Sequence, residues 1–190
     1  MTDLLFTLAS AALINNLILH WPLGSDTLLA DADRLRIHAL GLATTCLMLS
    51  NALLGHLLYE WLLHPLGLTG LRLFVWLALA VGLIGPVLKL LARVLPRLPL
   101  AGLWPLLLGN AAILGAGLLS SQAERGLGAT LALGLGGGLG FWLVLSLFDD
   151  LRQRTRDNDI ALPFRGLPIE LISAGLIGVA FLGFTGLFNP

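Results

Sequence analysis

Three asparagines lie inside strongly apolar stretches of this sequence. Asn15 and Asn16 stand in "INNLIL", and Asn110 follows Gly109 in "LLLGNAAILG". A bare amide is costly in an apolar helix, but it donates and accepts hydrogen bonds, so it can cap a helix that breaks inside a membrane. The alternative is a hydrogen bond to a neighbouring helix, which contributes about 0.6 kcal/mol. Because the pattern recurs after about 95 residues, we favour two broken helices.

Groups that bind metals or catalyse reactions are sparse. Cys46 is the only cysteine, and His20 is the histidine nearest to the first two asparagines, so both are weak candidates for a metal ligand. A lone buried cysteine usually behaves as a small apolar side chain, and no two histidines have the i, i+4 spacing of a metal site. We expect no catalytic residue, and no metal site built by this chain alone.

The composition is that of an integral membrane protein. Of the 190 residues, 57% are hydrophobic and 12% are charged, and the mean hydropathy is +0.90. A soluble domain carries about 25% charged residues. The net charge of zero predicts no basic surface for nucleic acid. The amino terminus lacks the basic region and cleavage site of a removable signal peptide, so we expect the first apolar segment to stay in the bilayer.

Six segments are transmembrane candidates, since about 20 apolar residues cross the hydrocarbon core. They are 4–20, 38–59, 71–90, 100–119, 127–148 and 169–188. The loops after the first, third and fifth segments, together with Lys89 at the end of the third segment, hold nine lysines and arginines, against two on the opposite side. The positive-inside rule places these three loops in the cytoplasm and both termini on the outer, periplasmic side. In the last loop, Asp149 and Asp150 are expected to form a solvated ion-pair surface with the arginines.

The segments divide into two groups of three around "RVLPRLPL" (93–100). An odd number of crossings makes the second group enter from the opposite side, as in an inverted-topology repeat. We expect one membrane domain, 1–190, with repeat 1 at about 1–95 and repeat 2 at about 98–190. In such folds, interrupted helices at matching positions mark the functional site near the midplane. Here those positions are Asn15 and Asn16 in one repeat, and Gly109 and Asn110 in the other.

The fifth segment contains the glycine-rich stretch "GLGGGLG" (134–140). A phosphate-binding loop follows a strand and opens a helix in a soluble unit, which does not describe this apolar segment. Gly134 and Gly138, and likewise Gly136 and Gly140, have the small-xxx-small spacing that lets membrane helices approach closely. Helix packing is therefore the expected role of these glycines.

Short motifs along nearly the whole chain resemble the A-type membrane component of the Rnf (Rsx) ion-translocating electron-transport complex. The same family contains the paired D and E membrane components of the sodium-translocating NADH:quinone reductase. The matching stretches are "MTDLL" (1–5), "NN" (15–16), "LG" (23–24), "GLATT" (41–45), "GN" with "LG" (109–115), "PFRG" (163–166), "LISAGL" (171–176) and "AFLGFTGL" (180–187). The resemblance implies six helices in two inverted halves, a homologous E-type partner, other subunits with iron–sulfur clusters and flavins, and the bacterial inner membrane.

The chain departs from the family at its cofactor. The resemblance implies a [2Fe–2S] cluster to which the A-type and E-type chains each give two cysteines. Asp26 and Ala111 stand at these two positions here. Iron–sulfur clusters need thiolate or sometimes imidazole ligands. We therefore expect the cluster to be absent or altered, and no cofactor to be bound by this chain alone. An ion-path role is a separate hypothesis for Asp26.

The sequence thus predicts an all-α membrane subunit that is not catalytic alone. With an E-type partner it would form the central scaffold of an Rnf-type complex, which couples electron transfer between ferredoxin and NAD to ion translocation. Two alternatives stay open. One is a small secondary transporter built on an inverted repeat, and the other is a purely structural subunit that has lost the redox cluster.

Overall fold

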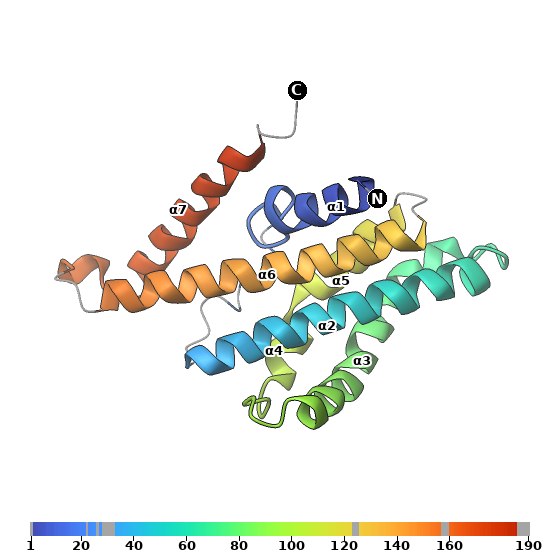
Figure 1. The fold of residues 1–190 in the computed structure, drawn as a ribbon, viewed down its shortest axis with the longest axis horizontal. Coiled ribbons are helices and arrows are strands. Elements are labelled where there is room, and N and C mark those ends of the chain that lie inside the picture. Colours follow the sequence, from blue (N-terminus) through green and yellow to red (C-terminus); the bar gives the residue numbers. More distant parts are fainter. Residues whose placement is uncertain are drawn as a thin grey trace.

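The protein is a bundle of helices (Figure 1). The computed structural model describes residues 2–21, 23–25, 27, 33–122, 126–156 and 160–185, and every regular element within them is helical. The elements are α1 (Thr2–Ala9), η1 (Ser10–Ile14), α2 (Arg34–Leu58), η3 (Tyr59–Leu63), η4 (Thr69–Leu71), α3 (Arg72–Val94), α4 (Trp104–Gly109), α5 (Ala111–Gln122), α6 (Leu127–Arg156), η5 (Leu162–Phe164) and α7 (Leu167–Thr185).

Four continuous helical stretches of the described chain are long and apolar enough to cross a membrane. They are Arg34–Leu63, Thr69–Val94, Leu127–Thr155 and Leu167–Phe184. Two shorter apolar helices, Leu4–Ile14 and Ala111–Ser120, fall within the two segments in which the sequence predicts an interruption. The chain is therefore a multi-pass membrane protein in which each short apolar helix is followed by two long ones.

Helix α6 is longer than the predicted segment 127–148 and ends at Arg156. Asp149 and Asp150 therefore lie in its last turns and not in a loop, so that prediction was wrong. The leucine, glutamine and arginines that follow them have good helix propensity. Arginines near a helix C-terminus also interact favourably with the negative end of the helix dipole.

The long helices α2 and α6 pack side by side at the centre of the bundle (Figure 1). Gly134 and Gly138 form the α6 side of this contact. A Cβ on Gly134 would lie 2.9 Å from the Cβ of Ala52, and a Cβ on Gly138 would lie 2.6 Å from the Cα of Thr45. Because a larger residue has no room at either position, the two glycines fix the separation of the helices.

The neighbouring side of α6 receives the first helical segment, α1 with η1. A Cβ on Gly136 would lie 2.5 Å from the Leu8 carbonyl oxygen, and a Cβ on Gly140 would lie 2.5 Å from the Ala12 carbonyl oxygen. The two glycine pairs, each with small-xxx-small spacing, thus serve two different partners. One pair faces α2 and the other faces the amino-terminal segment.

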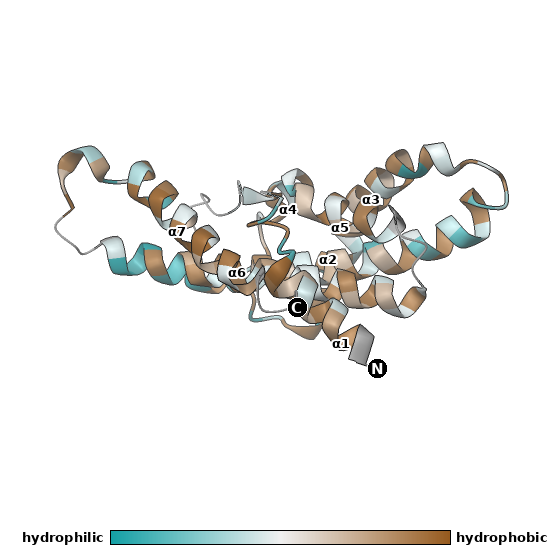
Figure 2. Ribbon diagram, turned by 90° about the horizontal axis from the view of Figure 1, so that it is seen from above, coloured by the Kyte–Doolittle hydropathy of each residue, from teal (hydrophilic) through white to brown (hydrophobic). Residues whose placement is uncertain are grey.

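The outer helices α3 and α7 each lie beside a short apolar helix from the other half of the chain. Helix α3 contacts α4 and α5 as well as α2, and α7 contacts η1 as well as α6. Only 17% of the apolar window of α3 and 11% of that of α7 is buried inside the chain. Figure 2 shows both helices as predominantly hydrophobic, with polar residues gathered where α6 leads towards α7. Most of their surface is therefore left for lipid or other subunits.

We predict that Gly138→Leu destabilises the bundle by about 1–3 kcal/mol, the usual cost of overpacking, because the new side chain meets the α2 backbone at Thr45. Gly175→Leu in α7 is the matched control, since a Cβ there meets nothing within 4 Å. Thermal unfolding of both variants in detergent provides the comparison. Equal stability of the two variants would contradict the role given to Gly138.

Candidate functional site

The helix break at Asn110 is held by its own side chain. Helix α4 ends at Gly109, Asn110 has extended backbone angles (φ −75°, ψ 94°), and α5 begins at Ala111. The Asn110 Oδ1 accepts a hydrogen bond of 3.0 Å from the Ala112 N–H. This is the geometry of a helix N-cap, in which the side-chain oxygen satisfies one of the free N–H groups of the first turn. The asparagine is 3% exposed, so water does not replace this bond.

Two polar residues of α2 hold the other side of the same break. The Asn110 Nδ2 lies 3.5 Å from the Thr44 Oγ1, and the Asn51 Nδ2 donates to the Ile113 carbonyl oxygen at 3.1 Å. Thr44 and Asn51 are both fully buried, and two turns of α2 separate them on one face. The sequence analysis did not identify Asn51. The sequence feature that could have pointed to Asn51 is a polar residue inside an apolar helix, seven positions after Thr44.

The first break uses the same asparagine hydrogen bond, although residues 17–20 form a turn and not a second helix as predicted. The helix ends at Ile14, and the buried Asn16 accepts a hydrogen bond from the Ile18 N–H at 3.0 Å through its Oδ1. Its Nδ2 donates to the Ala12 carbonyl oxygen at 2.9 Å. Asn15 differs, because it is exposed and its Nδ2 donates only to the Ser10 Oγ, at 3.0 Å. Asn16, rather than Asn15, is therefore the counterpart of Asn110.

The loop after the first break reaches the second one. Gly24 has a positive φ of 74°, and a Cβ on it would collide with the Asn110 Oδ1 and lie 3.0 Å from the Phe141 ring. The neighbouring Leu23 side chain packs over Gly115 of α5. Only glycine combines this backbone conformation with so close an approach. Asp26 follows in sequence but lies outside the described residues.

A small cavity of about 80 Å³ adjoins the break between α3 and the α4–α5 pair. Asn110 is the only residue with a polar side chain among those that line it, and Ala111 forms part of the wall. Gly109 and Ala111 are exposed at the surface of the chain, although Asn110 between them is buried. The backbone of the break is thus open towards whatever surrounds the protein.

The two weak ligand candidates do not join this site. His20 is exposed beside Trp21, with their ring centroids 5.5 Å apart, and it lines a separate small pocket against α7. Cys46 is partly buried in α2, two positions after Thr44. Among the described residues, no group of three or more histidine, cysteine and acidic side chains gathers as a metal site would require. The break therefore offers amide groups and small apolar side chains.

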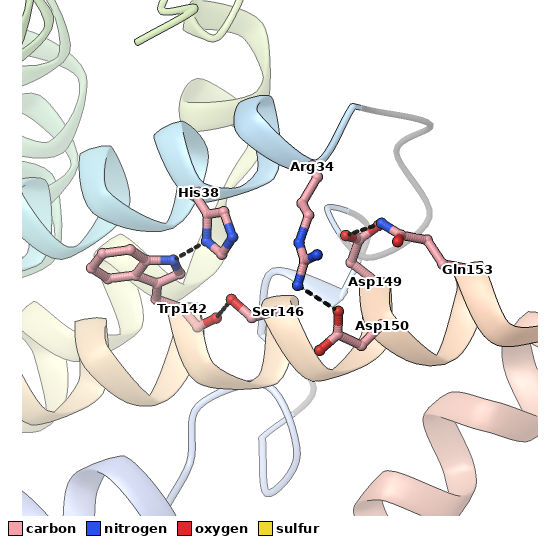
Figure 3. A network of polar contacts seen from close by, with 7 residues as sticks. All are labelled: Arg34, His38, Trp142, Ser146, Asp149, Asp150 and Gln153. Atoms are coloured by element: carbon pink, nitrogen blue, oxygen red, sulfur yellow. Dashed lines mark hydrogen bonds and ion pairs between the residues drawn. The ribbon is translucent and has the colours of Figure 1, made fainter. Parts of the chain in front are cut away.

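A polar network joins the start of α2 to the end of α6 (Figure 3). The Trp142 Nε1 donates to the His38 Nδ1 at 3.1 Å, and Arg34 pairs with Asp150 at 3.0 Å. Beside them, the Gln153 Nε2 donates to an oxygen of Asp149 at 2.8 Å. The His38–Trp142 and Arg34–Asp150 contacts tie α2 to α6, while the Gln153–Asp149 bond lies within α6.

A second ion pair continues from α6 to α7. The Arg152 Nε lies 2.8 Å from the Glu170 Oε1, and both side chains are only 15% exposed. The Arg34 and Asp150 side chains are 60% and 49% exposed. Water therefore screens the Arg34–Asp150 pair much more than the Arg152–Glu170 pair.

Comparison with known proteins gives one consistent result. The model of the family "Rnf-Nqr subunit, membrane protein" matches residues 4–188. Proteins named as the A component of an "Ion-translocating oxidoreductase complex" are similar over the full length of both chains, with 36% identity for the protein from Hahella chejuensis and 37% for that from Pseudomonas aeruginosa. The protein of the same name from Cereibacter sphaeroides is 35% identical over 98% of each chain.

We predict that Asn110→Ala destabilises the start of α5 by about 0.5–2 kcal/mol, the usual cost of removing a cap. Hydrogen–deuterium exchange at the Ala112 amide should become faster, because its acceptor is lost. Asn15→Ala is the control. This exposed asparagine bonds only to Ser10, and its replacement should change stability by less than about 0.5 kcal/mol. A protected Ala112 amide in Asn110→Ala would contradict the capping role.

We also predict that the two ion pairs differ in strength. In double-mutant cycles, Arg34→Gln with Asp150→Asn should show a coupling energy below about 1 kcal/mol, as is usual for exposed pairs. Arg152→Gln with Glu170→Gln should show a larger one, because this pair is better shielded from water. Chemical unfolding in detergent gives both values, and an Arg34–Asp150 coupling that exceeds the Arg152–Glu170 coupling would refute this ranking.

Proposed function

Because the chain belongs to the Rnf-Nqr family of membrane subunits, we propose that it is the A-type membrane component of a complex that couples electron transfer between ferredoxin and NAD to ion translocation. The observation that carries this proposal is the full-length similarity to proteins named as the A component of an ion-translocating oxidoreductase complex. Because that similarity extends over the whole chain, it includes both helix breaks.

The exposed backbone at the second break supports a protein partner at this place. Gly109 and Ala111 are exposed beside the apolar residues of α4 and α5. Irregular backbone is not tolerated against lipid hydrocarbon, because its polar groups find no hydrogen bonds there. Another polypeptide with groups that can pair with this backbone is the natural cover. We propose that the cover is the homologous E-type chain, and that the two chains form the central scaffold of the complex.

Three features support an inverted repeat within the chain. Asn16 and Asn110 cap their breaks in the same way, each accepting the N–H two residues ahead. The central helices α2 and α6 occupy the second position of each half. The third helix of each half, α3 or α7, covers the broken helix of the other half. We propose that the halves are related by a pseudo-two-fold axis between α2 and α6.

The charge distribution supports an orientation in the bacterial inner membrane. The polar network of Arg34 and Asp150 and the Arg152–Glu170 pair lie at the ends of helices that border the arginine-rich loops. By the positive-inside rule we propose that this end faces the cytoplasm and that the termini are periplasmic.

The residues of this chain do not fit the family's [2Fe–2S] cluster. The whole chain holds one cysteine, Cys46, which lies in α2 away from the wall that Ala111 forms. The methyl group of Ala111 cannot bind iron. We therefore propose that this protein keeps the scaffold without contributing two thiolates. The alternative of a solute transporter gains no support from the cavity at the break, since ligand pockets usually measure about 300–1,000 Å³.

A cross-linking experiment tests the partner. In a Cys46→Ala background, Ala111→Cys labelled with a thiol-reactive benzophenone should photo-cross-link to an E-type chain in native membranes, identified by mass spectrometry. Gly175→Cys on the exposed side of α7 is the control and should not give this product. Recovery of the tagged chain without other components of such a complex would overturn the proposed function.

A spectroscopic experiment tests the loss of the cluster. The purified pair of A-type and E-type chains should contain no iron in stoichiometric amount and give no [2Fe–2S] electron paramagnetic resonance signal. The variant Asp26→Cys/Ala111→Cys restores both thiolates of this chain and serves as the positive control. A [2Fe–2S] signal from the unmodified pair would refute our interpretation of Asp26 and Ala111.

A further inference from the structure

The side of α3 that faces away from the bundle carries exposed cations at one end. Lys89 and Arg93 lie one turn apart near the end of this helix, and Arg97 follows in the next loop. All three are exposed. The ion pairs between described residues join Arg34 to Asp150 and Arg152 to Glu170, so none of these three cations takes part in them.

The same side of α3 continues as a smooth apolar stripe. Ala78, Gly82 and Pro86 are exposed. They precede Lys89 at intervals of three or four residues, so they lie on the same side of the helix. A Cβ on Gly82 would meet nothing within 4 Å. The buried residues of this helix, Trp76, Ile84, Val87 and Leu91, point to the opposite side. The stripe is therefore open along its length and distinct from the wall of the cavity at Asn110.

Length and charge together indicate what kind of molecule fits this surface. Lys89 follows Ala78 by eleven positions, which is a rise of about 16 Å at 1.5 Å per residue and close to half of the roughly 30 Å hydrocarbon core. No aspartate or glutamate occurs anywhere from residue 61 to residue 123. The apolar stripe is thus about as long as a lipid acyl chain, and it ends in a local excess of positive charge.

We propose that this surface of α3, defined by Ala78, Gly82, Pro86, Lys89 and Arg93, binds an anionic phospholipid. The phosphate lies against Lys89 and Arg93, with Arg97 within reach from the loop. One acyl chain lies along the stripe over Gly82. Ammonium and guanidinium groups are the usual partners of phosphate oxygens, and long basic side chains extend to the headgroup level while their stems stay apolar.

A helix of another protein chain is the competing occupant, because small residues also let helices approach closely. The lipid is favoured because the cations stand at the end of the stripe, where α3 ends, and because no acidic side chain of α3 or its following loop neutralises them. A partner helix would need acidic residues of its own to pair with these cations.

Native mass spectrometry of the complex that contains the full chain tests this proposal. After extraction from vesicles that contain equal amounts of phosphatidylglycerol and phosphatidylcholine, the unmodified chain should retain phosphatidylglycerol preferentially. Lys89→Gln/Arg93→Gln should lower this retention by roughly tenfold or more, as expected for the loss of two basic contacts to an anionic headgroup. Gly82→Leu, which keeps the charges and fills the open stripe, should lower it as well.

The control is Arg72→Gln/Arg154→Gln, which removes two cations away from the stripe and should leave retention unchanged. The proposal is overturned if Lys89→Gln/Arg93→Gln retains phosphatidylglycerol like the unmodified chain. It is equally overturned if the control loses as much, because the effect would then be one of net charge. Photo-cross-linking of Gly82→Cys, labelled with a thiol-reactive benzophenone, to a neighbouring protein chain and not to phosphatidylglycerol would overturn the proposal and assign the stripe to a contact between proteins.

Discussion

A buried peptide group that leaves helical geometry finds no water to satisfy it, and two places in this chain where an apolar helix ends have this problem. At each place a buried asparagine accepts the N–H two residues ahead, Asn16 from Ile18 and Asn110 from Ala112. At the second, Thr44 of α2 contacts the Asn110 side chain and Asn51 of α2 donates to the Ile113 carbonyl oxygen. The position of α2 is thereby coupled to the start of α5, and a shift of either helix would expose unpaired amides at a cost of about 1–3 kcal/mol each.

Close packing serves the same constraint, because hydrogen bonds between helices need helices that approach closely. The glycines of α6 make this possible on two sides. Gly138 admits the α2 backbone at Thr45, next to the residue that contacts Asn110, while Gly140 admits the turn that precedes Asn16. Lipid tails are as apolar as leucine, so there is little hydrophobic force between such helices. The arrangement of the helices is therefore specified by steric fit and by a few buried hydrogen bonds.

The proposed loss of the cluster has a physical consequence for the scaffold. An iron–sulfur cluster bound by two chains would cross-link them covalently through metal and thiolate. With Ala111 in place of a thiolate, the contact between this chain and its proposed partner depends on backbone pairing and apolar packing around the break. Keeping the asparagine cap while losing the neighbouring thiolate fits a surface whose shape is still used. The feature of the family's architecture, the cap at Asn110, and the position of the family's cofactor ligand, Ala111, are thus adjacent residues, of which only the first is kept.

The sequence by itself determined the membrane environment, the approximate positions of the apolar helices and where two of them are short, because hydropathy and helix-breaking polar residues are local properties. It also determined that one cysteine cannot supply two thiolates. Other features were decided only by the tertiary structure. The sequence did not distinguish Asn15 from Asn16, nor identify Asn51, since burial and the reach to the Ile113 carbonyl depend on which helices become neighbours. The same holds for the placement of Gly24 over Asn110, and for the division of the α6 glycines between two partners. These contacts join residues from separate helices, whose relative position no local pattern encodes.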